Sequence, residues 1–407
     1  MPESPDLRLS RRGADEPASQ LVQRVAARFG VAEDAVRVAR APYRICPLGA
    51  HIDHQGGTVT AMAVDRAVQV AFVPSTSTEV RLSSLDFPGE TRFDLRRIPD
   101  RQAGDWGNFA RGAARVLQRE TPLRRGIWGL TAGRLDAGGL SSSAAISVAL
   151  LLALEQANDA LVSPERNVEL ALAIEREYLG LRIGILDQAA ILLSRRHELT
   201  WVDCQSRRHH RIAPPGGELG FAILIVASGL KQALVGTDYN RRVDECAAAA
   251  KLLLRAVGRD AAPLLRNVRP EEYAQHRHRL EAAPARRAAH FFGEMQRVAA
   301  GVEAWRQGDW PQFGRLVNES GRSSIENYEC GCPPLIDLVR VLQATPGVRG
   351  ARFSGAGFRG CCLALVDPAH AEQAAAHAIR EYGRRQPELA QQAWCLICQS
   401  GPGARLL

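Results

Sequence analysis

The amino-acid sequence predicts an α+β protein made of two packed domains. Its 407 residues, 46% hydrophobic and 24% charged, are ordinary for a soluble globular protein and sufficient for two cores. Strand-like and helical segments alternate through the first half, whereas the second half is mainly helical. A stretch rich in His, Arg, Pro and Gly, residues 207–217, separates the two halves. We therefore expect a disordered tail at residues 1–20, an amino-terminal domain at 21–210 and a carboxy-terminal domain at 211–407.

Two periodicities predict the regular elements of the first domain. Apolar residues at helical spacing indicate helices, and runs of β-branched or small apolar residues indicate strands. The expected helices are residues 18–29, 109–120, 144–157 and 164–179, and the expected strands are residues 35–40, 58–73, 80–82 and 127–132.

The second domain begins with a continuous apolar run that is typical of a buried strand. The expected strands are residues 221–227, 351–354 and 361–366, and the expected helices are residues 239–257, 285–307 and 309–317. Near the end, Cys395 and Cys398 lie within an apolar run. We interpret this run as another buried strand, not as a redox pair or half of a zinc site.

Charge and cysteine usage exclude several classes of protein. The net charge of +8 and the pI near 9.2 come from scattered arginines, and no basic block carries interleaved aromatic residues. This distribution suits anionic substrates better than nucleic acid. No uninterrupted apolar run reaches membrane-spanning length. Nine cysteines without a second CxxC pair or a secretory signal indicate free thiols in a cytoplasmic protein.

The densest cluster of polar side chains is found at residues 44–57. Turn-forming glycines surround the polar residues Arg44, His51, Asp53, His54 and Gln55, and strand-like runs flank the whole segment. Loops held between strands often carry function. A solvated loop with only local hydrogen bonds would fit the segment equally well, so the choice depends on residues further along the chain.

A glycine-rich turn and three serines open the expected helix at residues 144–157. Glycines let the backbone approach an anion, and the free N–H groups and dipole of a helix N-terminus favour phosphate. The hydroxyls can add a metal ligand. The segment is neither a Walker loop nor a Rossmann fingerprint. A serine-capped helix is the alternative, and it explains one serine better than three.

Asp187 lies in an apolar turn, where an isolated carboxylate would be costly without a partner. With Arg44 nearby it could act on a substrate hydroxyl. Glu175, twelve positions earlier, could face the same cavity and hold a cation. The alternatives are a helix N-cap for Asp187 and a solvated helix face for Glu175.

Taken together, these segments resemble the GHMP small-molecule kinases, and galactokinases in particular. Residues 44–57, 137–145, 184–188 and 354–360 occur in that family's order and spacing, and galactokinase-like pieces occur at residues 238–246 and 317–333. The resemblance implies a ribosomal-protein-S5-like amino-terminal domain and a ferredoxin-like carboxy-terminal domain, with the active site in the cleft between them. ATP and Mg²⁺ are the implied cofactors.

The resemblance also implies roles for individual residues. Asp187 matches the catalytic aspartate, Arg44 the arginine that supports it, and Ser143 and Glu175 the magnesium ligands. The residues implied for the ATP phosphates are Ala137, Gly138, Gly139, Leu140, Ser141, Ser142 and Ser143. The residues implied or considered for the sugar are Ala50, His51, Ile52, Asp53, His54, Arg182, Gly184, Tyr239 and Gly357. Gly355 and Gly360 belong to the same glycine loop as Gly357.

One departure from the family pattern predicts the substrate. Galactokinases usually carry a glutamate at the position of Ala50, where it binds the C6 hydroxyl of the sugar. A glutamate would repel a C6 carboxylate at a cost on the order of a few kcal/mol, and alanine removes that conflict. Together with a resemblance to galacturonokinases of the plant type, this predicts D-galacturonate, phosphorylated at C1. Arg182 or His54 would contact the carboxylate, although Arg182 could instead pair with Glu175 or Glu177.

Two other functions remain open from the sequence. One is a kinase for galactose, glucuronate or arabinose, and the other is a non-catalytic sugar sensor that acts through a partner. Retention of Asp187, Arg44 and the serine run favours an enzyme. We expect a monomer or weak homodimer with a small sugar as its partner, and with neither nucleic acid nor membrane bound.

Overall fold

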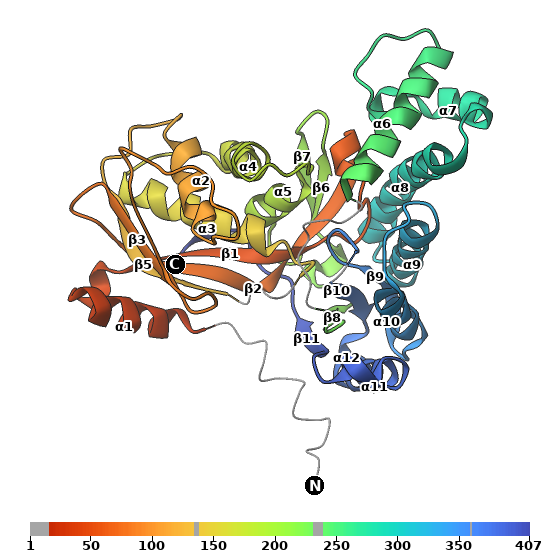
Figure 1. Ribbon diagram of the computed structural model, residues 1–407. Coiled ribbons are helices and arrows are strands. Elements are labelled where there is room, and N and C mark those ends of the chain that lie inside the picture. The colour runs from red at the N-terminus through yellow and green to blue at the C-terminus, as the bar shows by residue number, and fades with distance from the viewer. Residues whose placement is uncertain (1–15, 134–137, 231–238, 359) are drawn as a thin grey trace.

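Two β-sheets with helices packed around them organise the chain (Figure 1). The structure is a computed structural model that describes residues 16–133, 138–230, 239–358 and 360–407. In the first sheet the strand order is β12-β1-β2-β5-β3-β4, and β6 and β7 extend from β2. Its strands are β1 (Arg37–Ile45), β2 (Thr58–Pro74), β3 (Glu79–Ser84), β4 (Glu90–Asp94), β5 (Ile127–Ala132), β6 (Leu199–Asp203), β7 (His209–Ile212) and β12 (Arg405–Leu406).

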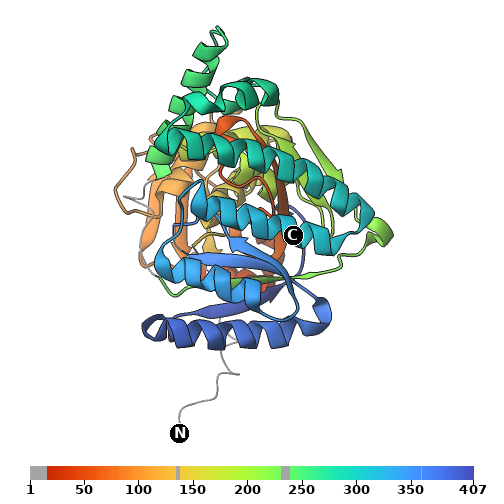
Figure 2. The ribbon, with the colours of Figure 1, turned by 90° about the vertical axis from the view of Figure 1, so that its right-hand side faces the viewer.

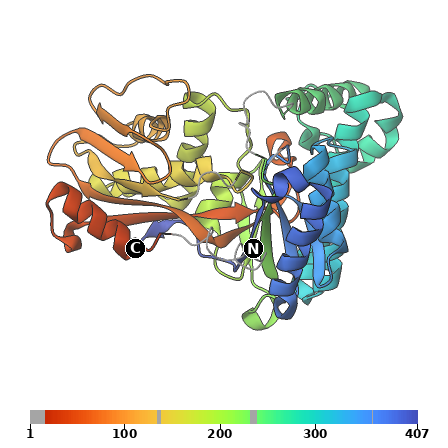
Figure 3. The same ribbon diagram turned by 60° about the horizontal axis from the view of Figure 1, so that its bottom comes forward.

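The long strand β2 joins two parts of this sheet. Its second half pairs with β1 and β5, and its first residues pair with β6, with Thr58 opposite Asp203. Figure 3 shows β2 reaching from the first sheet toward the helices of the second half. The register of β1 against β2 shifts between Pro42 and Arg44, because proline cannot donate a hydrogen bond to the ladder. The bulge lies directly before Arg44.

Helices cover both faces of the first sheet. They are α1 (Ala18–Phe29), α2 (Asn108–Leu117), α3 (Ser142–Ala157), α4 (Pro164–Ala173) with a π-helical turn at Ile174–Tyr178, and α5 (Leu186–Leu193). α3 is buried almost all round and packs on β1 and β2. On the opposite face, Leu21 and Val25 of α1 form a smaller core with Val38 and Leu130.

The second sheet is antiparallel, with the order β11-β8-β10-β9. Its strands are β8 (Ala222–Ala227), β9 (Val348–Phe353), β10 (Cys361–Val366) and β11 (Trp394–Cys398). The helices of this half are α6 (Tyr239–Ala256), α7 (Pro270–His276), α8 (Ala282–Gln307), α9 (Trp310–Glu326), α10 (Pro333–Ala344), α11 (Ala371–Arg385) and α12 (Pro387–Ala390). Figure 2 shows α8 and α9 lying side by side.

Short 3₁₀ turns connect many of these elements. They are Glu33–Ala35, Asp53–Gln55, Pro215–Gly217, Leu265–Asn267, Arg277–Arg279 and Pro368–His370. The described helices include none that is long and apolar enough to cross a bilayer. All nine cysteines are free, and Cys395 and Cys398 are buried in β11, as the sequence predicts.

Most expected elements are present, with differences at their ends. The expected helix at 164–179 stops at Ala173 and continues as a π-helical turn, and the expected helix at 309–317 runs on to Glu326. β4, β6, β7 and β12 were missed. β4, β7 and β12 are short and rich in charged or polar residues, and β6 is short and mostly buried, so none of them gives a strong alternation signal in the sequence.

The division into two domains remains a prediction, and two strands cross it. β7 lies inside the expected boundary stretch and pairs with β6 of the first sheet. β12 returns from the end of the chain to pair with β1, so the carboxy terminus lies beside the first sheet (Figure 1). Residues 1–15 of the expected tail lie outside the described residues.

Candidate active site

The segments singled out in the sequence meet where the two sheets approach each other. The carbonyl of Gly139 is the shared contact: it accepts hydrogen bonds from Arg44 Nη1 at 3.0 Å and from Ser354 Oγ at 2.6 Å. A Cβ at Gly355 would lie 2.7 Å from the Gly139 Cα, and one at Gly360 would lie 2.1 Å from the Gly138 oxygen. The two glycine loops are therefore packed backbone to backbone, at a distance that side chains would prevent.

Arg44 and Asp187 form an ion pair at the centre of this region. Arg44 Nε donates to Asp187 Oδ1 at 2.7 Å, and the hydroxyl of Ser141 donates to Oδ2. The Arg44 side chain is 4% exposed, whereas that of Asp187 is 28% exposed. Both oxygens of the Asp187 carboxylate are therefore held by protein, and the side chain remains partly accessible to a ligand.

Asp53 lies beside Asp187 and depends on Gly184. The Leu186 N–H donates to Asp53 Oδ2 at 3.4 Å, and a Cβ at position 184 would lie 2.1 Å from that oxygen. Burial and then the nearby charge of Asp187 raise the pKa of Asp53 to about 6. The absence of a side chain at Gly184 thus provides room for the Asp53 carboxylate.

Ser143 and Glu175 form the second pair of oxygen-bearing residues. Ser143 Oγ donates to Glu175 Oε1 at 2.7 Å, and the side-chain amide of Gln188 donates to Oε2. Glu175 is buried in the π-helical turn, a feature frequent at functional sites. Burial and then Asp187 raise the pKa of Glu175 to about 7. In the described part of the chain, no cationic side chain donates a hydrogen bond to Glu175, so the Ser143–Glu175 pair fits a hard cation such as Mg²⁺.

Protein ligands alone would leave such a cation incompletely coordinated. Among the described residues, no group of three or more His, Cys, Asp or Glu side chains could hold a metal. Mg²⁺ commonly binds through one or two carboxylates and completes its shell with water and phosphate oxygens. Two protein oxygens next to a phosphate-binding loop match that pattern.

The segment from Gly138 to Ser143 is shaped by its neighbours. The Arg44 N–H donates to the Leu140 carbonyl at 3.4 Å, and the Leu140 side chain is buried. Ser141 has a positive φ of 59°, which costs free energy in a residue other than glycine. That conformation places its hydroxyl on Asp187. Ser142 begins α3, and Ala137 lies outside the described residues.

Aromatic side chains line the segment from His51 to His54. The His51 ring stacks on Tyr328 at 4.5 Å, and His54 Nε2 lies 3.1 Å from the Tyr328 hydroxyl. Tyr239 contacts His54 edge-on at 6.1 Å. Burial lowers the pKa of His54 to about 4, so this ring is neutral at pH 7 and offers a hydrogen bond, not a charge. Tyr328 was not among the expected sugar residues.

Two other residues expected near the sugar differ in their surroundings. The Ile52 side chain is buried, and a Cβ at Gly57 would meet it at 2.6 Å, so it serves packing. Gly357 has a positive φ of 73°, and a Cβ there would lie 2.9 Å from Cys330 Sγ. Only glycine fits this position without strain.

Arg182 is engaged with a residue that the sequence did not suggest. Its Nη2 lies 2.8 Å from Asp244 Oδ1, and its side chain is about half exposed. It pairs with neither Glu175 nor Glu177, the partners considered as an alternative; Glu177 instead pairs with Arg119. A substrate carboxylate would therefore have to compete with Asp244 for Arg182.

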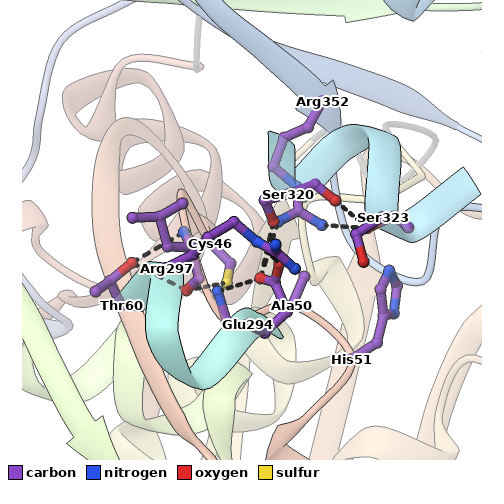
Figure 4. Close-up of polar contacts among 12 residues, drawn as sticks. Cys46, Ala50, His51, Thr60, Glu294, Arg297, Ser320, Ser323 and Arg352 are labelled. Carbon is purple, nitrogen blue, oxygen red and sulfur yellow. Dashed lines mark hydrogen bonds and ion pairs between the residues drawn. The ribbon is translucent and has the colours of Figure 1, made fainter. Parts of the chain in front are cut away.

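A buried polar network supports the backbone at Gly49 and Ala50 from behind (Figure 4). Glu294 of α8 accepts hydrogen bonds from the Gly49 N–H at 2.8 Å and from Ser320 Oγ at 2.8 Å. His290 Nε2 lies 3.0 Å from the Ala50 carbonyl. Gly49 and His51 both have positive φ, so this support holds an otherwise unfavourable turn.

Sequence reasoning missed this network, although α8 carries a signal for it. His290, Glu294 and Arg297 are spaced by four and three residues, which places them on one helix face. A polar stripe of that kind on a long helix usually faces solvent. Here it faces the polar loop, a contact that only the tertiary arrangement reveals.

The close packing of the two glycine loops can be tested with a matched pair of substitutions. Gly355→Ala and Gly216→Ala both place alanine at a φ near 70°, which costs roughly 1–2 kcal/mol. Only Gly355→Ala also collides with Gly139, because nothing lies within 4 Å of a Cβ at position 216. We expect Gly355→Ala to have the lower melting temperature. Equal melting temperatures of the two variants would contradict the packing described.

Comparison with known proteins matches the chain to three family descriptions. Residues 108–195 match "GHMP kinases N terminal domain", residues 302–385 match "GHMP kinases C terminal", and residues 26–74 match "Galactokinase galactose-binding signature". The last range contains the polar loop at 44–57. The first contains Ser141, Ser143, Glu175 and Asp187.

Individual relatives cover almost the whole chain. A galacturonokinase from Arabidopsis thaliana is 48% identical over 97% of this chain and 99% of its own length. A galactokinase from Chloroflexus aggregans (strain MD-66 / DSM 9485) is 32% identical over 90% of this chain and 92% of its own.

Solved structures show the same similarity. The crystal structure of Lactococcus lactis galactokinase complexed with galactose superposes with a TM-score of 0.87 at 27% identity, covering 95% of this chain and 99% of that one. Methanococcus jannaschii mevalonate kinase, with a TM-score of 0.64 and 15% identity over 89% of this chain and 98% of its own, shares the fold. The chain therefore belongs to the GHMP kinase family, within its galactokinase-like branch.

Proposed function

We propose that this protein is an ATP-dependent sugar 1-kinase that converts D-galacturonate to galacturonate 1-phosphate and ADP. The observation that carries the proposal is the Arg44–Asp187 pair, which lies against the glycine loop at 138–139 and leaves the carboxylate partly accessible. The similarity to a galacturonokinase over nearly the whole chain supports the same function.

Asp187 would orient the C1 hydroxyl of the sugar and accept its proton. Phosphoryl transfer requires little covalent work from the protein, so alignment and charge stabilisation dominate catalysis. Arg44 fixes one carboxylate oxygen and Ser141 binds the other, which limits the rotation of Asp187. The positive charge of Arg44 also favours the negative charge that develops in the transition state.

The ATP phosphates would lie on the loop from Gly138 to Ser143, where α3 begins and the dipole of the helix favours an anion. Ala137 remains a proposed member of this loop. Ser143 and Glu175 would hold Mg²⁺, which when bound neutralises charge on the phosphates. The free cysteines and the use of ATP support a cytoplasmic location.

The sugar would bind between the polar loop and Tyr239. Asp53 is the proposed hydroxyl acceptor, and Gly184 leaves the space that its carboxylate occupies. Gly184 and Gly357 remain proposed neighbours of the sugar. His51 and His54 are neutral and can donate or accept hydrogen bonds. At C6, Ala50 offers no carboxylate of its own, which suits a uronic acid better than a neutral hexose.

Galactose is the second candidate substrate. The galactokinase signature over residues 26–74 and the galactokinase relatives favour it. Ala50 argues against it, because an alanine cannot bind a C6 hydroxyl. A non-catalytic sugar sensor is less well supported, since such a protein needs neither the Arg44–Asp187 contact nor the Ser143–Glu175 contact.

The first prediction concerns substrate choice. We expect a higher kcat/KM for galacturonate than for galactose in the wild type. Ala50→Glu should reverse this preference, because the new carboxylate repels the C6 carboxylate and can bind a C6 hydroxyl. Ala50→Gln is the matched control, with the same bulk and no charge. It should lower kcat/KM for galacturonate less than Ala50→Glu does. ADP release measured with both sugars checks this, and a wild type that prefers galactose would refute the proposed substrate.

The second prediction concerns the catalytic aspartate. Asp187→Asn should lower kcat by about a hundredfold or more, because proton acceptance from the sugar is lost. The KM values should change little, since the binding loops stay in place. Asp100→Asn removes the same charge at an exposed ion pair and should leave kcat unaltered. A fall in kcat of less than about tenfold for Asp187→Asn would argue against its role as proton acceptor.

The third prediction links pH to Mg²⁺. Because the pKa values of Glu175 and Asp53 are raised to about 7 and about 6, both carboxyls become protonated as pH falls through that range, and activity should be lost there. Mg²⁺ binds the ionised form of Glu175, so more Mg²⁺ should move the acidic limb of the kcat/KM profile to lower pH. Glu175→Gln should abolish that shift. If the acidic limb of the wild-type kcat/KM profile does not move with Mg²⁺ concentration, Glu175 is excluded as a Mg²⁺ ligand.

A further inference from the structure

Resting on the proposed function, we propose that a buried net positive charge behind Ala50 selects the anionic C6 group of the substrate. The charge belongs to three side chains, Glu294 and Arg297 of α8 and Arg352 of β9, which we call the charge cluster. The cluster acts on the sugar through space and through the loop backbone. Its members are positioning and specificity-determining residues that do not touch the reacting atoms.

The charge count of the cluster does not balance. Glu294 lies 2.6 Å from Arg297 and 3.9 Å from Arg352, so two guanidinium groups share one carboxylate. Within the described part of the chain, neither arginine has another carboxylate within ion-pair distance. The side chains of Glu294 and Arg352 are 0% exposed and that of Arg297 is 16% exposed. One positive charge is therefore left over where water cannot solvate it well.

Neutral groups accept the hydrogen bonds of Arg352 without removing this charge. Arg352 donates to the hydroxyls of Ser320 and Ser324 and to the Phe353 carbonyl. Arg297 Nη2 is buried and makes no hydrogen bond. Dipoles of this kind satisfy donors, but a buried charge without a counter-charge remains costly.

The cluster lies directly behind the residues expected at C6. Glu294 accepts the Gly49 N–H at 2.8 Å, and His290 from the same helix contacts the Ala50 carbonyl at 3.0 Å (Figure 4). The effect of the charge is felt at the next residue: burial, and then the charge of Arg352, hold the pKa of His51 well below its ordinary value. Ala50 itself cannot supply the missing negative charge. A carboxylate at C6 of the sugar can, whereas a hydroxymethyl group cannot.

Other basic groups near the sugar fit this role less well. Arg182 already has Asp244 as a counter-ion and is about half exposed, which weakens its field by solvent screening. Arg44 is paired with Asp187. Burial lowers the pKa of His54 to about 4, so it carries no charge at pH 7. Arg176 has no carboxylate partner in the described part of the chain, but it is exposed and donates to the Ile183 carbonyl, so solvent screens its charge. Among the buried groups, the charge cluster is the one that carries an uncompensated charge.

Substitution of Arg297 tests the proposal while retaining the Glu294–Arg352 contact. Arg297→Gln brings the cluster to neutrality, and Arg297→Lys keeps its charge. We expect Arg297→Gln to raise the KM for galacturonate about tenfold at unchanged kcat, because the positive charge that attracts the C6 carboxylate is lost while the reacting groups stay in place. The Ki of galactose as a competing sugar should change less than about twofold, and Arg297→Lys should restore the wild-type KM. Arg306→Gln, an exposed position of α8, is the matched control and should have no effect.

A second measurement does not depend on activity. If position 50 faces an uncompensated positive charge, a carboxylate there should be stabilising. We expect Ala50→Glu to melt at a higher temperature than Ala50→Gln at pH 7.5, with a difference that persists at high salt because the site is buried. Equal melting temperatures, or a more stable glutamine variant, would overturn the proposal even if Arg297→Gln failed to fold.

The kinetic outcomes separate this inference from the proposed function. A wild type that prefers galactose would refute the proposed substrate, whatever Arg297→Gln does. Suppose instead that the wild type prefers galacturonate. An Arg297→Gln variant that then weakens the binding of both sugars equally, or of neither, would overturn the proposed role of the charge cluster alone. Equally weaker binding of both sugars would mean that Arg297 serves only to hold the loop.

Discussion

The carbonyl of Gly139 is the contact on which the candidate site depends. Arg44 from the first sheet and Ser354 from the second sheet both donate to it, so one peptide group ties the two halves together. Such a contact requires that the two glycine loops pack without side chains between them. The same guanidinium then holds Asp187. Alignment of the Asp187 carboxylate, the proposed proton acceptor, is therefore coupled to the docking of the two halves.

Strain at this junction is balanced by buried hydrogen bonds. Ser141 and His51 both have positive φ, a conformation that would be lost without local support. Ser141 is held by its bond to Asp187, and the turn before His51 is held by Glu294. In both cases, a carboxylate accepts a hydrogen bond from the strained segment: that of Asp187 is partly exposed and that of Glu294 is buried. This arrangement presents the polar loop in one conformation before any ligand binds, which lowers the entropic cost of binding.

The proposed specificity follows from what is missing as much as from what is present. Ala50 removes a negative charge from the sugar pocket, and Arg297 and Arg352 leave a positive one behind it. A neutral sugar would leave that positive charge unbalanced, whereas the C6 carboxylate of a uronic acid would supply the missing negative charge. The charge lies on α8 and β9, far from the polar loop in the sequence, so the substrate preference belongs to the assembled pocket and not to one motif.

The sequence by itself determined the family, the main elements and the identity of the central residues. Glycine loops, the serine run and Asp187 are local patterns whose chemistry can be read from neighbouring residues. Contacts between distant segments were decided by the tertiary structure alone: the partner of Arg182, the neutral state of His54 and the network around Glu294. The physical reason is that burial and counter-charges arise from packing across some 240 residues, which no local pattern encodes.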